Sequence, residues 1–121
     1  MRIFKHRSFH HWAESEGLTN NILRLAIDEM SKGLYEANLG SGLYKKRVAL
    51  QGKGKRGSHR TLIAFRKEER AFFVYDFSKN VRANVDAKEE KIYRQFAKYF
   101  LNADEKAIKK MIENGALFEV K

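Results

Sequence analysis

The sequence predicts an α+β fold, a small antiparallel sheet with N-terminal and C-terminal helices packed on it. Two patterns support this prediction. Apolar residues recur with the helical period of 3.6 in residues 22–30 and again in residues 92–112. Between them, from residue 34 to residue 77, the pattern changes to alternation or to short apolar runs, which are typical of strands. No internal repeat or linker interrupts the chain, so we expect residues 1–121 to form a single domain.

The N-terminal part is predicted to hold one short strand and two helices. Met1 to Lys5 has the pattern of a strand, and His10 to Glu16 that of a short helical turn ended by Gly17. A firmer helix follows, because Thr19 is a suitable N-cap and Gly33 a suitable stop. Leu18 and Leu23 are spaced to pack on each other as a hydrophobic staple at the start of this helix. Its apolar face consists of Ile22, Leu23, Ala26, Ile27 and Met30.

The middle of the chain is predicted to form most of the sheet. Residues 34–40 have the pattern of a weak strand or a loop. Residues 43–50 form a firmer strand, with one set of side chains inward (Tyr44, Val48 and Leu50) and another outward (Lys45 and Arg47). Residues 60–66 and 71–77 are aromatic-rich apolar runs joined by a polar turn, which indicates a hairpin. Because both runs are almost continuously apolar, we expect them to be central strands covered on both faces.

Two helices and a closing strand are predicted for the C-terminal part. Asp86 is a suitable N-cap, and the face expected to pack on the sheet carries Ile92, Phe96 and Phe100, flanked by Tyr93 and Tyr99. Residues 102–105, Asn-Ala-Asp-Glu, have the form of a capping box that opens a last helix, with Gly115 at its end. The residues expected inside are Ala107, Ile108, Met111 and Ile112. Residues 116–120 then form the closing strand.

Positive charge is concentrated in the central third of the chain. The formal net charge is +10, and residues 43–85 hold 12 basic and 3 acidic residues. Residues 1–42 hold 5 of each kind, and residues 86–121 hold 8 basic and 7 acidic residues. Self-repulsion within such a cluster costs stability, whereas an anion-binding surface profits from the summed field. The sequence therefore predicts a polyanionic partner.

Composition excludes several classes of protein. Hydrophobic residues make up 43% of the chain and charged residues 33%, which is typical of a globular rather than a disordered protein. No run approaches the roughly 18 apolar residues of a membrane span, and the N-terminus lacks the apolar stretch of a signal peptide, so we expect a cytoplasmic protein. The chain has no cysteine and hence no disulfide or thiolate metal site. His6, His10 and His11 lack matched ligands downstream, so we expect them to be surface or core-edge residues and not a metal site.

A basic loop punctuated by glycines lies at the centre of the charged region, from Gln51 to His59. Its glycines allow the backbone to approach a phosphate closely, and Lys53, Lys55 and Arg56 supply neutralising charge. The spacing is not that of a P-loop, in which Gly-Lys-Ser/Thr opens a helix. A solvated turn is the alternative. Further cations in the flanking segments favour a binding surface, namely Lys45, Arg47, Arg60, Lys79 and Arg82.

Two runs of the sequence resemble a known family. The run Lys46 to Arg60, which contains the loop, and the run Phe72 to Asn80, an aromatic strand ending in a Lys-Asn pair, are similar to RelE/HigB-type toxins of bacterial type II toxin-antitoxin systems. The similarity is greatest to a longer subgroup with a Gly-Lys-Gly-Lys-x-Gly-Gly-x-Arg loop. Ser58 departs from that pattern, which has a second glycine there. The resemblance covers about residues 34–101, and residues 102–120 fit the C-terminal helix of the subgroup.

The resemblance implies a RelE-like fold and a metal-independent endoribonuclease without a cofactor. Toxins of this type are mRNA interferases, which inhibit translation by cutting messenger RNA, usually while it occupies the ribosomal A site. It also implies a cognate antitoxin, a small DNA-binding protein from the adjacent gene, that silences the toxin. The expected partners are thus this antitoxin, mRNA and the ribosome, and no membrane.

The expected catalytic residues are Arg60, Lys79, Lys55 and Lys53. Arg60 is the candidate clamp for the phosphate in the transition state, because a guanidinium is a permanently charged fork. The general base stays open among Lys53, Lys55, Lys79 and His59, since a lysine amid other cations can have a lowered pKa. Tyr75 either stacks on a base or belongs to the core. The expected RNA-binding residues are Lys45, Arg47, Arg56, His59, Tyr75 and Arg82.

Two other functions stay open at this point. ParE-like toxins of the same fold group bind DNA gyrase and cleave no RNA, although the dense phosphate-binding loop argues against that role. A non-catalytic RNA-binding or ribosome-associated protein would need only the basic surface. The three functions differ in the damage that they cause in a cell, which is cut transcripts, DNA damage or neither.

Overall fold

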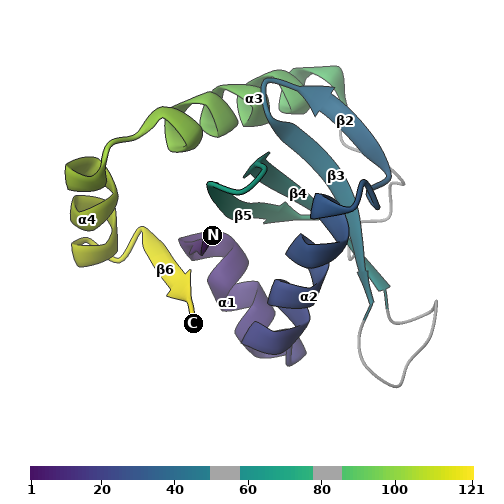
Figure 1. The fold of residues 1–121 in the computed structure, drawn as a ribbon, viewed down its shortest axis with the longest axis horizontal. Coiled ribbons are helices and arrows are strands. Elements are labelled where there is room, and N and C mark those ends of the chain that lie inside the picture. The colour runs from purple at the N-terminus through teal and green to yellow at the C-terminus, as the bar shows by residue number, and fades with distance from the viewer. Residues whose placement is uncertain (50–57, 78–85) are drawn as a thin grey trace.

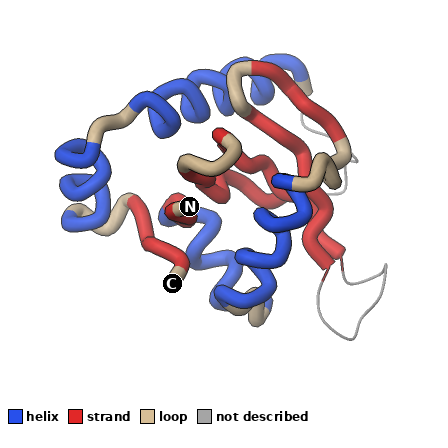
Figure 2. The backbone as a smooth tube through the Cα atoms, viewed as in Figure 1, coloured by secondary structure: helices blue, strands red, loops and turns tan. Residues whose placement is uncertain are grey.

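The computed structural model describes residues 1–49, 58–77 and 86–121, which form a six-stranded sheet with helices on both of its faces (Figure 1, Figure 2). Among these residues, no helix has both the length and the apolar character needed to span a bilayer. The predicted α+β class is confirmed. In chain order the elements are β1 (Arg2–His6), α1 (Arg7–Glu16), α2 (Asn20–Ser31), β2 (Ala37–Gly40), β3 (Leu43–Ala49), β4 (Ser58–Arg66), β5 (Arg70–Asp76), α3 (Ala87–Asn102), α4 (Glu105–Glu113) and β6 (Leu117–Val120).

The strands follow the order β2-β3-β4-β5-β1-β6 across the sheet. Every neighbouring pair is antiparallel except β1 and β5, which run parallel. The first strand of the chain therefore lies inside the sheet, between β5 and β6. The two apolar runs predicted to be central strands, β4 and β5, lie in the middle of the sheet, and the predicted closing strand is the edge strand β6.

Helices α1 and α2 cover one face of the sheet. Phe9 of α1 and Leu23 of α2 are fully buried and belong to one core cluster with Ile63 and Phe73 of the central strands. The predicted apolar face of α2 is confirmed, since Leu23, Ala26, Ile27 and Met30 are buried. Helix α1 begins at Arg7, three residues before the predicted start, because the His6 ring accepts the Ser8 N–H and caps it.

The ends of both helices follow the predicted signals. The Thr19 hydroxyl accepts the Ile22 N–H at 3.3 Å and opens α2. Gly17 ends α1 in the left-handed conformation with φ 72°, where a side chain would strain the backbone. Gly33, with φ 85°, follows the end of α2 in the same way.

Helices α3 and α4 cover the other face of the sheet, where a stack of three phenylalanine rings joins α3 to the central strands. The Phe72 ring lies between the rings of Phe4 and Phe100, with centroids 5.0 Å apart on each side. All three residues are buried in the same core cluster. Two arginines of the hairpin fix the C-terminal end of α3: Arg66 donates to the Leu101 carbonyl at 2.9 Å and Arg70 to the Ala103 carbonyl at 2.6 Å.

The predicted apolar face of α3 is partly wrong. Phe100 is buried as predicted, but Ile92 and Phe96 are 50% and 40% exposed. The helix rests on the sheet through Ala97, Phe100 and Leu101 instead. Apolar side chains occupy more than one face of this helix, and the small Ala97 allows its backbone to lie closest to the sheet, so the Ile92 face turns outward.

The predicted start of the last helix is also wrong. Helix α3 continues through Asn102, and Ala103 takes an extended conformation that separates the two helices. Asp104 therefore caps α4, accepting the Ala107 N–H at 2.8 Å. A capping box does exist, but it opens α3, where the Asp86 and Glu89 side chains exchange hydrogen bonds with each other's backbone N–H. In α4 only Ile108 is fully buried among the residues predicted to lie inside.

Strand β3 alternates as predicted, with one exception on its buried side. Val48 is buried and Tyr44 half-buried, while Leu50 lies outside the described residues. Lys46, which shares their face, is also buried, with its Nζ 2.8 Å from the Glu29 carboxylate on α2. This ion pair connects α2 to the sheet. Part of the positive charge of residues 43–85 thus stabilises the fold and does not form a binding surface, as shown by Lys46, Arg66 and Arg70.

Candidate nucleic-acid interface

Two arginines lie side by side at the end of the sheet where the basic loop is attached. Arg47 of β3 and Arg60 of β4 are cross-strand partners, so their side chains project from the same face a few ångströms apart. Residues 50–57 connect these two strands directly beyond the Ala49–Ser58 pair. The described strand ends that flank this segment, Ala49 and Ser58, each lie two residues from one of these arginines.

A second row of side chains continues this face. Lys45 pairs with Leu62, and Leu62 pairs with Tyr75 of β5, so Lys45 and Tyr75 lie beside the two arginines on the face that α3 covers. A register shift between Leu62 and Ile63 sets Tyr75 on this side of the sheet. We call Lys45, Arg47, Arg60 and Tyr75 the sheet-end cluster.

Tyr75 is neither wholly core nor wholly surface. It is half-buried and stacks on Tyr93 of α3, with ring centroids 5.0 Å apart and planes 21° apart. The next ring along the chain, Phe77, is fully buried, and its N–H donates to the Arg60 carbonyl at 3.1 Å. The last described residue before the segment with Lys79 and Arg82 thus lies beside Arg60.

A carboxylate that the sequence did not suggest lies between the two arginines. Glu36 Oε1 is 3.8 Å from Nε of Arg47 and 3.9 Å from Nε of Arg60. Its backbone N–H donates to the Lys45 carbonyl at 2.8 Å, which fixes it at the entry to β2. These long ion pairs bring both guanidinium groups near one carboxylate. One signal was available, because Glu36 is the only acidic residue between Glu29 and Glu68.

Not every predicted site residue joins the sheet-end cluster. His59 projects from the opposite face, is only 8% exposed and packs its ring 4.8 Å from that of Trp12. Alternation along β4 places it there, because it directly precedes Arg60. Lys53, Lys55, Arg56, Lys79 and Arg82 lie outside the described residues.

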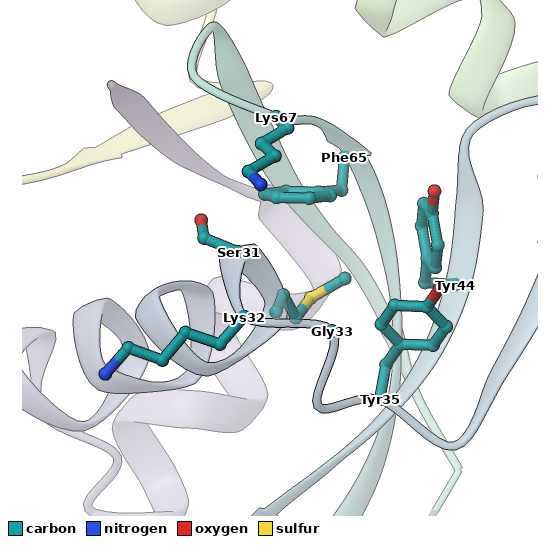
Figure 3. A pocket seen from close by; sticks show the side chains of 8 residues that line it. Ser31, Lys32, Gly33, Tyr35, Tyr44, Phe65 and Lys67 are labelled. Carbon is teal, nitrogen blue, oxygen red and sulfur yellow. The ribbon is translucent and has the colours of Figure 1, made fainter.

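A separate pocket of about 580 Å³ opens at the other end of the sheet. Figure 3 shows the aromatic rings of Tyr35, Tyr44 and Phe65 around it, with Lys67 on the Phe65 side. The rings of Tyr35 and Tyr44 meet edge to face at 4.8 Å. Tyr44 and Phe65 belong to the core cluster beneath α1 and α2, whereas the sheet-end cluster lies on the face that α3 covers, so this pocket and the cluster are on opposite faces of the sheet.

The chain matches the family model described as the RelE toxin of the RelE/RelB toxin-antitoxin system over residues 1–120. This chain therefore belongs to the RelE toxin family, whose members are toxins of toxin-antitoxin systems. The predicted RelE-type membership is confirmed, and with it a cognate antitoxin as the partner. A search of curated proteins found no match.

Proposed function

We propose that this toxin is a metal-independent endoribonuclease that cuts messenger RNA in the ribosomal A site. The observation that carries the proposal is the adjacent pair Arg47 and Arg60 at the end of the sheet, next to the attachment of the basic loop. Two neighbouring guanidinium groups suit one phosphate group, because each can donate two hydrogen bonds to its oxygens.

The chemistry requires three events at one phosphodiester. The 2′-oxygen loses its proton and attacks phosphorus, the phosphorane gains a negative charge, and the 5′-oxygen takes up a proton as its bond to phosphorus breaks. In this proposal Arg60 and Arg47 neutralise the phosphorane, which is the role that oriented cations fill most effectively. Tyr75, whose ring stacks on that of Tyr93, is the proposed aromatic contact for a neighbouring base.

The proton-transfer groups are proposed from two sources. Lys53, Lys55, Lys79 and His59 are the candidates from the sequence; His59 is not proposed further, because it is buried against Trp12 on the opposite face from Arg60, and the structure adds Glu36. Because Glu36 lies within 4 Å of both guanidinium groups, a phosphate bound there would bring its 2′-hydroxyl close to a carboxylate. We therefore assign Glu36 to orienting the arginines and to accepting the 2′-proton.

We expect Glu36→Gln to slow cleavage about 100-fold, the usual effect of losing a general base. The amide is neutral and can neither accept the proton nor attract the guanidinium groups. Single-turnover cleavage on programmed ribosomes, measured across pH, checks this. Glu68→Gln, an equal charge change on the turn between β4 and β5, is the control and should cleave at the wild-type rate.

The pH profile separates the two roles of Glu36. Loss of proton acceptance removes the limb of the profile that rises from low pH, whereas loss of orientation alone lowers the rate equally at all pH values. Wild-type rates in Glu36→Gln would remove this residue from the mechanism without affecting the roles of Arg47 and Arg60.

Mapping of transcript ends after induced expression tests the proposed function as a whole. We expect new 5′ ends at fixed positions within codons of translated messages, because the ribosome would hold the RNA in register with the site. The matched control is the same transcript without its start codon, which should remain intact. DNA damage without new ends would indicate a gyrase-directed toxin, and growth inhibition with neither effect a passive RNA binder.

A further inference from the structure

The outer side of α3 carries an apolar strip that nothing in the described part of the chain covers. Ile92, Phe96 and Tyr99 follow one another at intervals of four and three residues, so they lie in one row along the helix. Their side chains are 50%, 40% and 58% exposed, and no other large hydrophobic residue of α3 is as exposed. Figure 1 shows α3 at the margin of the molecule, where a partner has access to it.

A small pocket lies along one side of this strip. It has a volume of about 190 Å³ and is lined by His6, Ser8, Val74, Tyr93 and Phe96. Burial and the neighbouring Arg7 lower the pKa of His6, so its ring is neutral at neutral pH and adds no charge to the pocket. The volume suits a single aliphatic or aromatic side chain that inserts beside Phe96.

Cations border the other side of the strip. Lys88, Lys91 and Lys98 are exposed and follow intervals of three and seven residues, which places them in the adjacent row of the helix. Gln95 and Asn102 complete this row, so it holds no carboxylate. An apolar strip with cations along one border is complementary to an amphipathic helix whose apolar face has acidic residues along one edge.

We propose that the Ile92–Phe96–Tyr99 strip of α3 docks an amphipathic, acid-edged helix of the cognate antitoxin, with one of its apolar side chains in the pocket beside Phe96. The partner follows from membership of the RelE family. The surface follows from the exposed apolar row, the pocket and the lysine border. The proposal does not depend on the nuclease chemistry.

The position of the strip also gives a route to inhibition. Phe96 contacts the Tyr93 ring, with centroids 6.0 Å apart, and Tyr93 stacks on Tyr75 of the sheet-end cluster. A helix on the strip therefore extends toward Tyr75 when it continues past Tyr93. The bound antitoxin then covers Tyr75, on which an RNA base is proposed to stack, while most of its contacts lie on the strip of α3.

Binding of the purified antitoxin to toxin variants tests the docking surface. We expect Phe96→Asp to weaken the complex at least about 100-fold, because a carboxylate replaces an apolar anchor and faces acidic partner residues. Replacing Lys88, Lys91 and Lys98 together by glutamine should weaken it about 10-fold and flatten its salt dependence. The control is Leu25→Asp on α2, which alters an equally exposed apolar residue and should leave affinity unchanged.

Three further measurements make the outcome decisive. Circular dichroism establishes that each variant is folded. Phe96→Asp should still inhibit growth, and co-expression of the antitoxin should no longer relieve this inhibition. Unchanged affinity of folded Phe96→Asp overturns the proposal. A free toxin that is dimeric and becomes monomeric with Phe96→Asp, while antitoxin affinity stays the same, assigns the strip to a second copy and also overturns it.

Discussion

Arg60→Ala is expected to abolish growth inhibition and to slow RNA cleavage about 1000-fold, in the range seen when an oriented transition-state donor is removed. Arg60 forms a cross-strand pair with Arg47, and its side chain is 31% exposed, so its removal leaves no cavity in the core. Its loss halves the guanidinium pair that is proposed to receive the phosphorane charge. Plating with induced expression and single-turnover cleavage on ribosomes both report the effect.

The controls for Arg60 separate charge, shape and folding. Lys67→Ala removes the same charge from the far end of the same hairpin and should remain toxic. Arg60→Lys keeps the charge but loses the planar fork, so it should restore only a small part of the rate. A folded Arg60→Ala variant that still stops growth would rule out Arg60 as the phosphate clamp.

Phe72→Ala is expected to lower the free energy of unfolding by about 3–5 kcal/mol, the usual cost of deleting a buried phenylalanine ring. Phe72 is fully buried and is the middle ring of the stack with Phe4 and Phe100. Its removal therefore deprives Phe4 of β1 and Phe100 of α3 of the ring that both pack against. Urea unfolding followed by fluorescence and circular dichroism measures the change.

The comparison for Phe72 is an apolar residue of α3 that belongs to neither core cluster. Ile92→Ala removes a half-exposed side chain and should change stability by less than about 1 kcal/mol in the free toxin. Equal losses for Phe72→Ala and Ile92→Ala would show that the stack does not hold α3 on the sheet.

The sequence predicts the elements of this fold well because their signals are local. Thr19, Asp86 and Gly17 act on neighbouring backbone groups. The runs that form β4 and β5 are almost continuously apolar, so both faces of these strands must be covered, which places them inside the sheet. The orientation of α3 was predicted less well because it depends on tertiary packing. Its apolar residues span more than one face, and only contact with the sheet selects Ala97, Phe100 and Leu101 for burial.

The candidate site shows the same division between local and long-range information. Alternation along β3 and β4 places Arg47 and Arg60 on one face, which a sequence can indicate once the pairing is known. The approach of Glu36 depends on the pairing of β2 with β3, and the burial of Lys46 depends on its contact with α2. The isolation of Glu36 among basic residues singles it out in the sequence but does not place it beside the two arginines. The same alternation turns His59 away from Arg60, which a list of basic residues cannot reveal.

The placement of β1 between β5 and β6 has a consequence for folding. Strand β1 pairs with β5, whose partner residues begin at Arg70, and with β6, which begins at Leu117. Contacts so distant along the chain form late, since much of the polypeptide must be present before they close. Deletion of β6 therefore leaves β1 with one partner strand instead of two, so the place of β1 in the sheet depends on a segment more than a hundred residues away along the sequence.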